Sequence, residues 1–235
     1  RRHTRSFHVT GVQTCALPIF MNIIKNFINI LNKIKKNTDS KIQIIAVSKT
    51  FDLNYIKPLL EYGHLHFGEN RVNEATLKWS EEIKKNPNLR IHLIGKLQSN
   101  KVREALKVFS YIHSLDSKKL ATLLDNEQQK NSIDIKYFIQ VNIGNEKQKS
   151  GVTIDELEDF INFCKFKTKL NVIGLMCIPP VNSSSDFFFK NMNELAKKNN
   201  FYELSMGMSN DYESAVDNGA TFIRVGSGIF GTRIN

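Results

Sequence analysis

Short runs of apolar, β-branched residues recur along this chain, and they alternate with segments of helical spacing. Eight such runs lie at residues 42–49, 64–69, 91–95, 111–115, 136–143, 171–178, 202–208 and 222–228. Helical patterns lie between them, among others at residues 53–62, 71–83, 100–109, 117–129, 154–166 and 187–199. Because the runs are apolar on both faces, they are typical of parallel strands buried between a core and covering helices. This alternation predicts an α/β fold.

The number of alternations favours a closed barrel over an open sheet. An amphipathic helix is predicted before the first strand, because apolar residues recur at helical spacing at Ile24, Phe27, Ile28, Leu31 and Ile34. A doubly wound open sheet is the alternative, but Lys49 stands where the glycine fingerprint after its first strand is expected. A chain of 235 residues is in the size range of one barrel domain. We therefore expect a single (β/α)8 TIM barrel over residues 21–235, preceded by a helix.

Composition and charge exclude several classes of partner. The net charge of +10 raises the question of nucleic acid, but the lysines are scattered along predicted helix faces, so we expect a solvated basic surface instead. No run approaches the ~20 apolar residues that cross a bilayer, so no membrane partner is expected. The three cysteines, Cys15, Cys164 and Cys177, form no metal-ligand cluster. Their odd number indicates a reducing, cytoplasmic location.

The first twenty residues differ in composition from the rest of the chain. They hold three arginines and no lysine, whereas the remainder is rich in Lys, Asn and Ile. They lack the apolar centre and cleavage site of a secretory signal. Because the stretch GVQTCALPI resembles translated read-through of a sequencing adapter, we predict that residues 1–20 are a non-native extension and that the natural start is Met21. A disordered native extension is the alternative.

Polar residues and glycines follow several predicted strands at their carboxyl ends. Lys49 follows the first strand, Asn70 the second and Ser209 the seventh, while Gly226 and Ser227 lie at the end of the eighth. The carboxyl ends of barrel strands form the face that carries the active site. We therefore expect these residues to share one site.

The chemistry of these residues points to a ligand that is held at two ends. Glycine N–H groups and serine hydroxyls in the last two loops are typical of a phosphate site. Burial at a strand end would lower the pKa of Lys49 and favour a Schiff base with an aldehyde. Pyridoxal 5'-phosphate (PLP) carries both groups, so we expect Lys49 and the phosphate loops to lie across the barrel mouth from each other. Two alternatives stay open: a Lys49 that extends into solvent, and a sugar-phosphate barrel without a Schiff base.

Seven ordered segments resemble the YggS/PROSC family of PLP homeostasis proteins. They are AVSKT, FGENRVNEA, IHLIGKLQSNKV, VNIGNEKQKSGV, GLMCIPP, SMGMSNDYESAV and FIRVGSGIFGTR, and they run from residue 46 to residue 233. The resemblance implies a barrel similar to the N-terminal domain of alanine racemase, with PLP bound covalently.

The same resemblance implies a role for individual residues. Lys49 is expected to form the Schiff base, and the phosphate is expected to contact Ser209, Gly226 and Ser227. Arg224 matches the arginine that faces the pyridine nitrogen, where a permanent cation disfavours protonation of the ring and weakens it as an electron sink. Asn70 is expected near the ring, and Met206 is expected to pack against its face.

The expected function is to hold PLP and to take part in its homeostasis in the cell, by buffering it or by delivering it to PLP-dependent apo-enzymes. The alternative is an amino-acid racemase. A racemase needs a second base opposite the lysine, which similar enzymes supply as a tyrosine from a further domain and a partner subunit. We expect no such tyrosine here, with Tyr212 near the barrel mouth as the alternative. We expect racemase activity at trace level at most, and a monomer.

Overall fold

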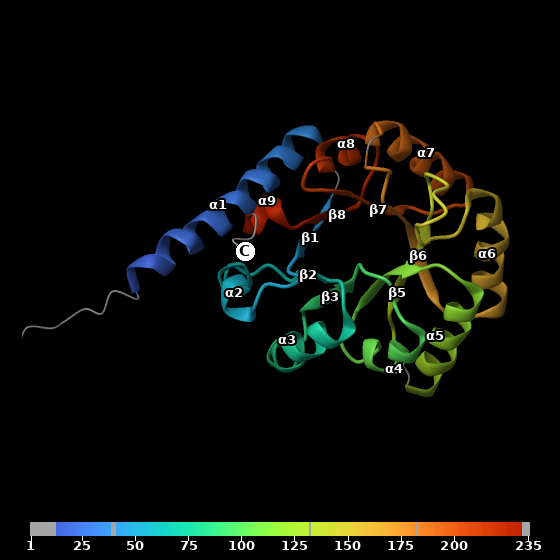
Figure 1. Ribbon diagram of the computed structural model, residues 1–235, viewed down its shortest axis with the longest axis horizontal. Helices are drawn as coiled ribbons and strands as arrows, with labels where there is room; N and C mark the ends of the chain where they lie inside the picture. Colours follow the sequence, from blue (N-terminus) through green and yellow to red (C-terminus); the bar gives the residue numbers. More distant parts are fainter. Residues whose placement is uncertain (1–12, 39–40, 132, 182, 232–235) are drawn as a thin grey trace, which may run out of the picture.

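The computed structural model describes residues 13–38, 41–131, 133–181 and 183–231. Eight parallel strands form one closed barrel in the order β1-β2-β3-β4-β5-β6-β7-β8, and β8 pairs with β1 (Figure 1). The strands are β1 (Gln43–Val47), β2 (His66–Glu69), β3 (Arg90–Leu93), β4 (Tyr111–Leu115), β5 (Lys136–Val141), β6 (Asn171–Cys177), β7 (Glu203–Met208) and β8 (Phe222–Val225). The predicted (β/α)8 barrel is confirmed.

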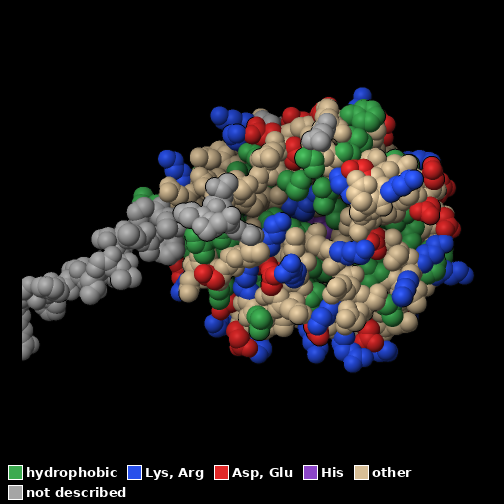
Figure 2. All heavy atoms as spheres, in the orientation of Figure 1, with side chains coloured by type: hydrophobic (Ala, Val, Ile, Leu, Met, Phe, Trp, Pro, Cys, Tyr) green, Lys and Arg blue, Asp and Glu red, His purple; other side chains and the backbone are tan. Residues whose placement is uncertain are grey.

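Helices alternate with the strands and cover the outside of the barrel (Figure 1). They are α1 (Gln13–Asn37), α2 (Leu53–Glu61), α3 (Val72–Lys85), α4 (Val102–Ala105), α5 (Lys118–Asn131), α6 (Ile154–Lys167), α7 (Ser185–Lys198), α8 (Tyr212–Asp217) and α9 (Ser227–Phe230), with a short 3-10 helix η1 (Ser99–Lys101) before α4. No helix in the described part of the chain is both long and apolar enough to span a bilayer. Basic and acidic side chains are interspersed over the face shown in Figure 2.

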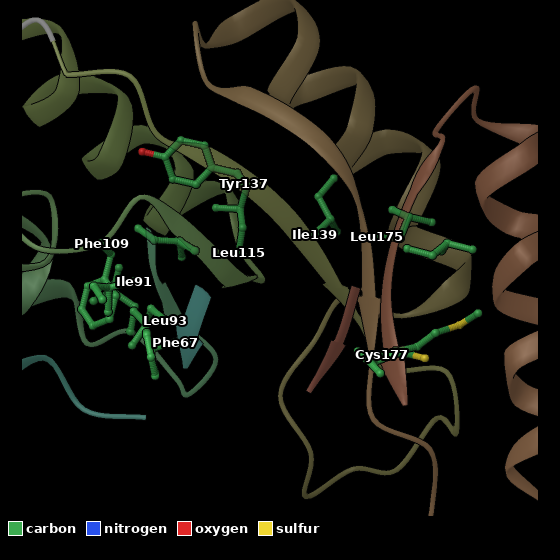
Figure 3. Packing of buried hydrophobic residues seen from close by; sticks show 14 of the residues in the cluster. Phe67, Ile91, Leu93, Phe109, Leu115, Tyr137, Ile139, Leu175 and Cys177 are labelled. Carbon is green, nitrogen blue, oxygen red and sulfur yellow. The ribbon is translucent and has the colours of Figure 1, made fainter. Parts of the chain in front are cut away.

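Two apolar clusters form because successive residues of each strand point to opposite faces of the sheet. The larger cluster lies between the strands and the helices, and Figure 3 shows part of it, with side chains such as Phe67, Leu93 and Leu175. A smaller cluster consists of Ile45, Tyr111, Phe138, Met176 and Phe222. Ile45 belongs to the smaller cluster whereas its neighbours Ile44 and Ala46 belong to the larger one, as the alternation requires.

Two predicted elements have different boundaries in the structure. The eighth strand was expected to reach residue 228, but it ends at Val225 and helix α9 begins at Ser227. The helical pattern at residues 100–109 becomes the 3-10 helix η1 and the four-residue helix α4. In both places a turn of helix follows directly on an extended segment, and apolar spacing over so few residues does not separate the two conformations.

Helix α1 begins before the predicted helix start at Met21. It runs from Gln13, so residues 13–20 are helical, whereas residues 1–12 lie outside the described residues. Its residues Ile23, Phe27, Ile30 and Ile34 are buried in the larger cluster. Whether residues 1–20 are native stays a prediction.

Four histidines inside the fold make its stability sensitive to acid. Burial lowers the pKa of His64 and of His66 to about 4, and it lowers the pKa of His92 and His113 well below 6.5. Between pH 6.5 and about 4 the unfolded chain therefore takes up protons that the folded protein does not, which favours unfolding. We expect the free energy of unfolding to fall by at least about 2 kcal/mol between pH 7 and pH 5, measured by urea titration. A value that stays constant over this interval would show that these rings are protonated in the folded protein.

Candidate functional site

A pocket of about 750 Å3 opens where the carboxyl ends of the strands meet. Its lining includes six of the seven predicted site residues, namely Lys49, Asn70, Ser209, Arg224, Gly226 and Ser227. The loop after β6 supplies Ile178, Pro179 and Pro180 as a further wall. The six predicted residues were expected at the carboxyl end of the barrel, and in the structure they line one cavity there.

Lys49 lies in a turn after β1 and its side chain is exposed at the pocket. Strand β1 ends at Val47, and Thr50 has a positive φ of 66°, so the chain leaves the barrel directly after Lys49. The expectation of a buried Lys49 amine was therefore wrong, because the strand ends two residues earlier than predicted. The amine lines the pocket but keeps its access to water.

A buried carboxylate holds the backbone just before Lys49. Glu69 is fully buried at the end of β2, and its Oε1 accepts hydrogen bonds from the Ser48 hydroxyl at 2.8 Å, from Lys78 Nζ at 2.8 Å and from Trp79 Nε1 at 3.0 Å. Lys78 Nζ also donates to the Ser48 carbonyl oxygen at 2.8 Å. Glu69 thus ties helix α3 to the peptide that leads into Lys49. Sequence reasoning gave Glu69 no role, although a carboxylate that ends an apolar strand is a signal for such a network.

Arg224 is a buried cation whose side chain reaches the pocket. It is 4% exposed, its Nη1 donates to the Ser205 hydroxyl at 2.8 Å, and its Nη2 donates to the Cys177 carbonyl oxygen at 2.9 Å. Burial lowers the pKa of the Arg224 guanidinium from its ordinary value, and Asp211 opposes this shift. A guanidinium nevertheless stays protonated in proteins. Burial also raises the pKa of the Cys177 thiol to about 12, as expected of an unreactive cysteine.

Backbone N–H groups converge on one hydroxyl oxygen at the start of α9. Ser209 Oγ accepts hydrogen bonds from Gly226 N at 3.3 Å and from Gly228 N at 3.2 Å. We call Ser209, Gly226, Ser227 and Gly228 the N–H cup. The cup was expected across the mouth from Lys49, but β8 pairs directly with β1, so the two lie on neighbouring strands. This difference follows from barrel closure, which local sequence patterns do not contain.

Asn70 and Met206, which were both expected near the PLP ring, lie in different places. Asn70 lines the pocket, and Gly95 packs against its backbone so closely that a Cβ on Gly95 would lie 2.3 Å from the Asn70 carbonyl oxygen. Met206 is fully buried in the larger cluster and is not among the lining residues. Its neighbour Ser205 bonds to Arg224, so Met206 occupies the opposite face of β7. Met208 lines the pocket instead.

Comparison with known proteins shows which family this chain resembles. The family described as "Alanine racemase, N-terminal domain" matches residues 24–234. A pyridoxal phosphate homeostasis protein of Aquifex aeolicus (strain VF5) is 34% identical over 228 residues, which covers 91% of this chain and 99% of that protein. The structure of PipY of Synechococcus elongatus PCC7942 with PLP bound has a TM-score of 0.78 at 34% identity, and the match covers 89% of this chain and 100% of PipY.

An alanine racemase of Clostridium difficile 630 shares the fold at 15% identity, with a TM-score of 0.68 over 92% of this chain and 58% of the racemase. Identity at this level concerns the fold alone. The family match and the relative from Aquifex aeolicus cover nearly the whole chain. This chain therefore belongs to the alanine racemase N-terminal domain family and, within it, to the pyridoxal phosphate homeostasis proteins.

Proposed function

We propose that this protein binds PLP through a Schiff base on Lys49 and holds it for PLP homeostasis in the cell. The observation that carries the proposal is one pocket lined by Lys49, by Arg224 and by three residues of the N–H cup, namely Ser209, Gly226 and Ser227. Its volume of about 750 Å3 is in the range of small-molecule sites. The structure of PipY, a homologue at 34% identity, contains bound PLP.

Lys49 is the residue that we assign to covalent attachment. Bound PLP would supply an aldehyde for a Schiff base, and Lys49 would supply the amine nitrogen, whose two hydrogens would leave with the aldehyde oxygen as water. Because Lys49 is exposed at the pocket, incoming PLP reaches the amine without a rearrangement of the barrel. Easy access in both directions suits a protein that takes up PLP and gives it away.

The N–H cup is the part of the site that we assign to the phosphate. Gly226 N and Gly228 N already point at one oxygen, Ser209 Oγ, and a phosphate oxygen requires the same donors. The hydroxyls of Ser209 and Ser227 both line the pocket and add two further donors. The cup therefore offers uncharged donors to a dianion.

Two features favour a carrier over a racemase. Arg224, a permanent cation at the pocket, disfavours a protonated ring nitrogen and so weakens the ring as an electron sink. The structure describes all six tyrosines, and no tyrosine lines the pocket as a second base. We therefore propose at most trace racemisation.

The setting in the cell is part of the same proposal. We propose a cytoplasmic monomer that buffers PLP or delivers it to PLP-dependent apo-enzymes. Free buried thiols at Cys164 and Cys177 agree with a reducing compartment. Relatives at 31% to 34% identity are named pyridoxal phosphate homeostasis proteins.

Absorbance and borohydride reduction test the covalent attachment. We expect the purified protein, after incubation with PLP, to absorb visible light as a Schiff base and to gain one PLP in intact mass after reduction. Peptide mapping should place the label on Lys49, because this amine shares the pocket with the cup. A label on another lysine as the main product would contradict the assignment. Phosphate affinity without any visible absorbance would instead support the sugar-phosphate barrel.

A further inference from the structure

A chain of hydrogen bonds crosses the barrel interior and ends on Arg224. His66 Nδ1 lies 2.9 Å from His92 Nε2, and His92 Nδ1 lies 2.9 Å from His113 Nε2. His113 Nδ1 lies 2.9 Å from the Ser205 hydroxyl, which accepts from Arg224 Nη1 at 2.8 Å. We call His66, His92, His113 and Ser205 the relay. Strands β2, β3, β4 and β7 each contribute one of its members.

The relay is buried except at its outer end. His66 is the first residue of β2 and is half-buried at the amino-terminal mouth of the barrel, whereas His92 and His113 are fully buried. The His92 ring stacks on Tyr111 at 4.2 Å between centroids, and the His113 ring stacks on Phe138 at 4.4 Å. These contacts hold both rings in planes that suit the hydrogen bonds.

Arg224 fixes the direction of one hydrogen bond of the relay, and one direction of the others joins all three rings to it. A guanidinium only donates, so the Ser205 oxygen accepts from Arg224 and keeps its proton and a second lone pair. In the relay that we infer, Ser205 donates this proton to His113 Nδ1. His113 must then carry its proton on Nε2 and donate to His92 Nδ1. By the same rule His92 donates from Nε2 to His66 Nδ1. In this direction all three rings are neutral Nε2–H tautomers.

The surroundings keep the relay uncharged. Burial lowers the pKa of His92 and of His113, and Arg224 lowers the pKa of His113 further. Burial also lowers the pKa of His66, with smaller effects in the same direction from His64, Arg90, Lys41 and Lys136. A protonated His66 has no acceptor on Nδ1, so it would break the chain at its outer end.

Arg224 has no carboxylate partner within ion-pairing distance among the described residues. Its guanidinium donates hydrogen bonds to the Ser205 hydroxyl and the Cys177 carbonyl oxygen, both uncharged. Neutral acceptors fix the position of a guanidinium without cancelling its charge. The charge of Arg224 is therefore not cancelled by an ion pair, although Asp211, which lines the same pocket, acts on it electrostatically.

We propose that the relay positions Arg224 and keeps its positive charge directed at the ligand, so that the pocket selects a ring nitrogen that carries a lone pair. The ligand part of this proposal rests on the proposed function. The relay histidines are 26 and 21 positions apart in the sequence, so no local pattern indicates that they bond to one another inside the barrel. His66, His92, His113 and Ser205 act through Arg224 and are positioning residues.

The first test uses the wild-type protein without PLP. Long-range proton–nitrogen NMR spectra of histidine-labelled protein at pH 7.5 distinguish the two neutral tautomers and the protonated ring. We expect His66, His92 and His113 as neutral Nε2–H tautomers. An Nδ1–H tautomer on His92 or His113, or a protonated ring on either, would overturn the relay.

The second test compares variants by equilibrium titration with PLP. His113→Phe keeps a ring to stack on Phe138 but removes the acceptor for Ser205, and we expect about tenfold weaker binding, the effect of one lost hydrogen bond near a charge. His113→Gln keeps one acceptor and one donor and should bind within about threefold of the wild type. His64→Phe is the matched control, because His64 is buried and bonds to the backbone carbonyl oxygen of His66, not to a side chain of the relay.

The outcomes separate the relay from the proposed function. Binding by His113→Phe at the wild-type affinity, or equally weak binding by His113→Phe and His113→Gln, would overturn the positioning role. Wild-type protein that binds no PLP in this titration would refute the proposed function. In that case the tautomer spectra still decide whether the relay exists.

Discussion

Replacement of Lys49 by alanine should abolish covalent capture of PLP and weaken its binding by about a hundredfold or more, because only the N–H cup and Arg224 remain to hold it. At a PLP concentration of a hundred times the dissociation constant, binding stabilises the wild-type protein by about 2.7 kcal/mol. A hundredfold weaker site leaves about 0.4 kcal/mol under the same conditions. Urea unfolding with and without PLP measures both values, and borohydride reduction followed by intact mass measures the covalent bond.

Two further variants make this result specific. Lys49→Arg retains the positive charge but has no amine that forms a Schiff base, so it should fail in the same way as Lys49→Ala. Lys149→Ala is the control, because Lys149 Nζ donates to the carbonyl oxygen of Pro179 at the pocket wall and is not a lining residue. A Lys49→Ala protein that still gains one PLP after reduction, or a Lys149→Ala protein that loses it, would contradict the assignment of Lys49.

The fold could be predicted from the sequence because each strand is marked by a short apolar run of neighbouring residues. Each strand lies within or next to its predicted apolar run, and the alternation with helices was sufficient to favour a closed barrel. The boundary between β8 and α9 was missed because Gly226 and Ser227 suit either conformation. The pairing of β1 with β8, which makes Lys49 and the cup neighbours, joins residues near the two ends of the chain.

The polar groups inside the fold were the hardest to predict. His66 and His113 show no ligand spacing in the sequence, so no local pattern marks them. Their hydrogen bonds join residues 21 to 92 positions apart, so only the closed barrel brings them together. Lys49 was placed at the correct end of its strand, but its exposure depends on where β1 stops and how the chain turns at Thr50.

Glu69→Ala should be the most destabilising of these changes, with a loss of about 3–5 kcal/mol in the free energy of unfolding. The substitution leaves the ammonium of Lys78 without its ion-pair partner, and it leaves the Trp79 N–H and the Ser48 hydroxyl without their acceptor. Unpaired buried groups cost more than the pair contributes, because the protein cannot return them to water. Urea unfolding of the protein without PLP measures the effect directly.

A double variant separates the cost of the orphaned charge from the value of the pair. Glu69→Leu combined with Lys78→Met removes both charges and should be more stable than Glu69→Ala alone, since apolar groups of similar size replace a buried pair at little cost. Glu81→Ala is the surface control, because its partner Lys84 is exposed, and its urea midpoint should match the wild type. If Glu69→Ala unfolds at the wild-type midpoint, Glu69 does not hold the peptide before Lys49. If it is destabilised as expected, the carboxylate that bonds to the residue before Lys49 also stabilises the barrel.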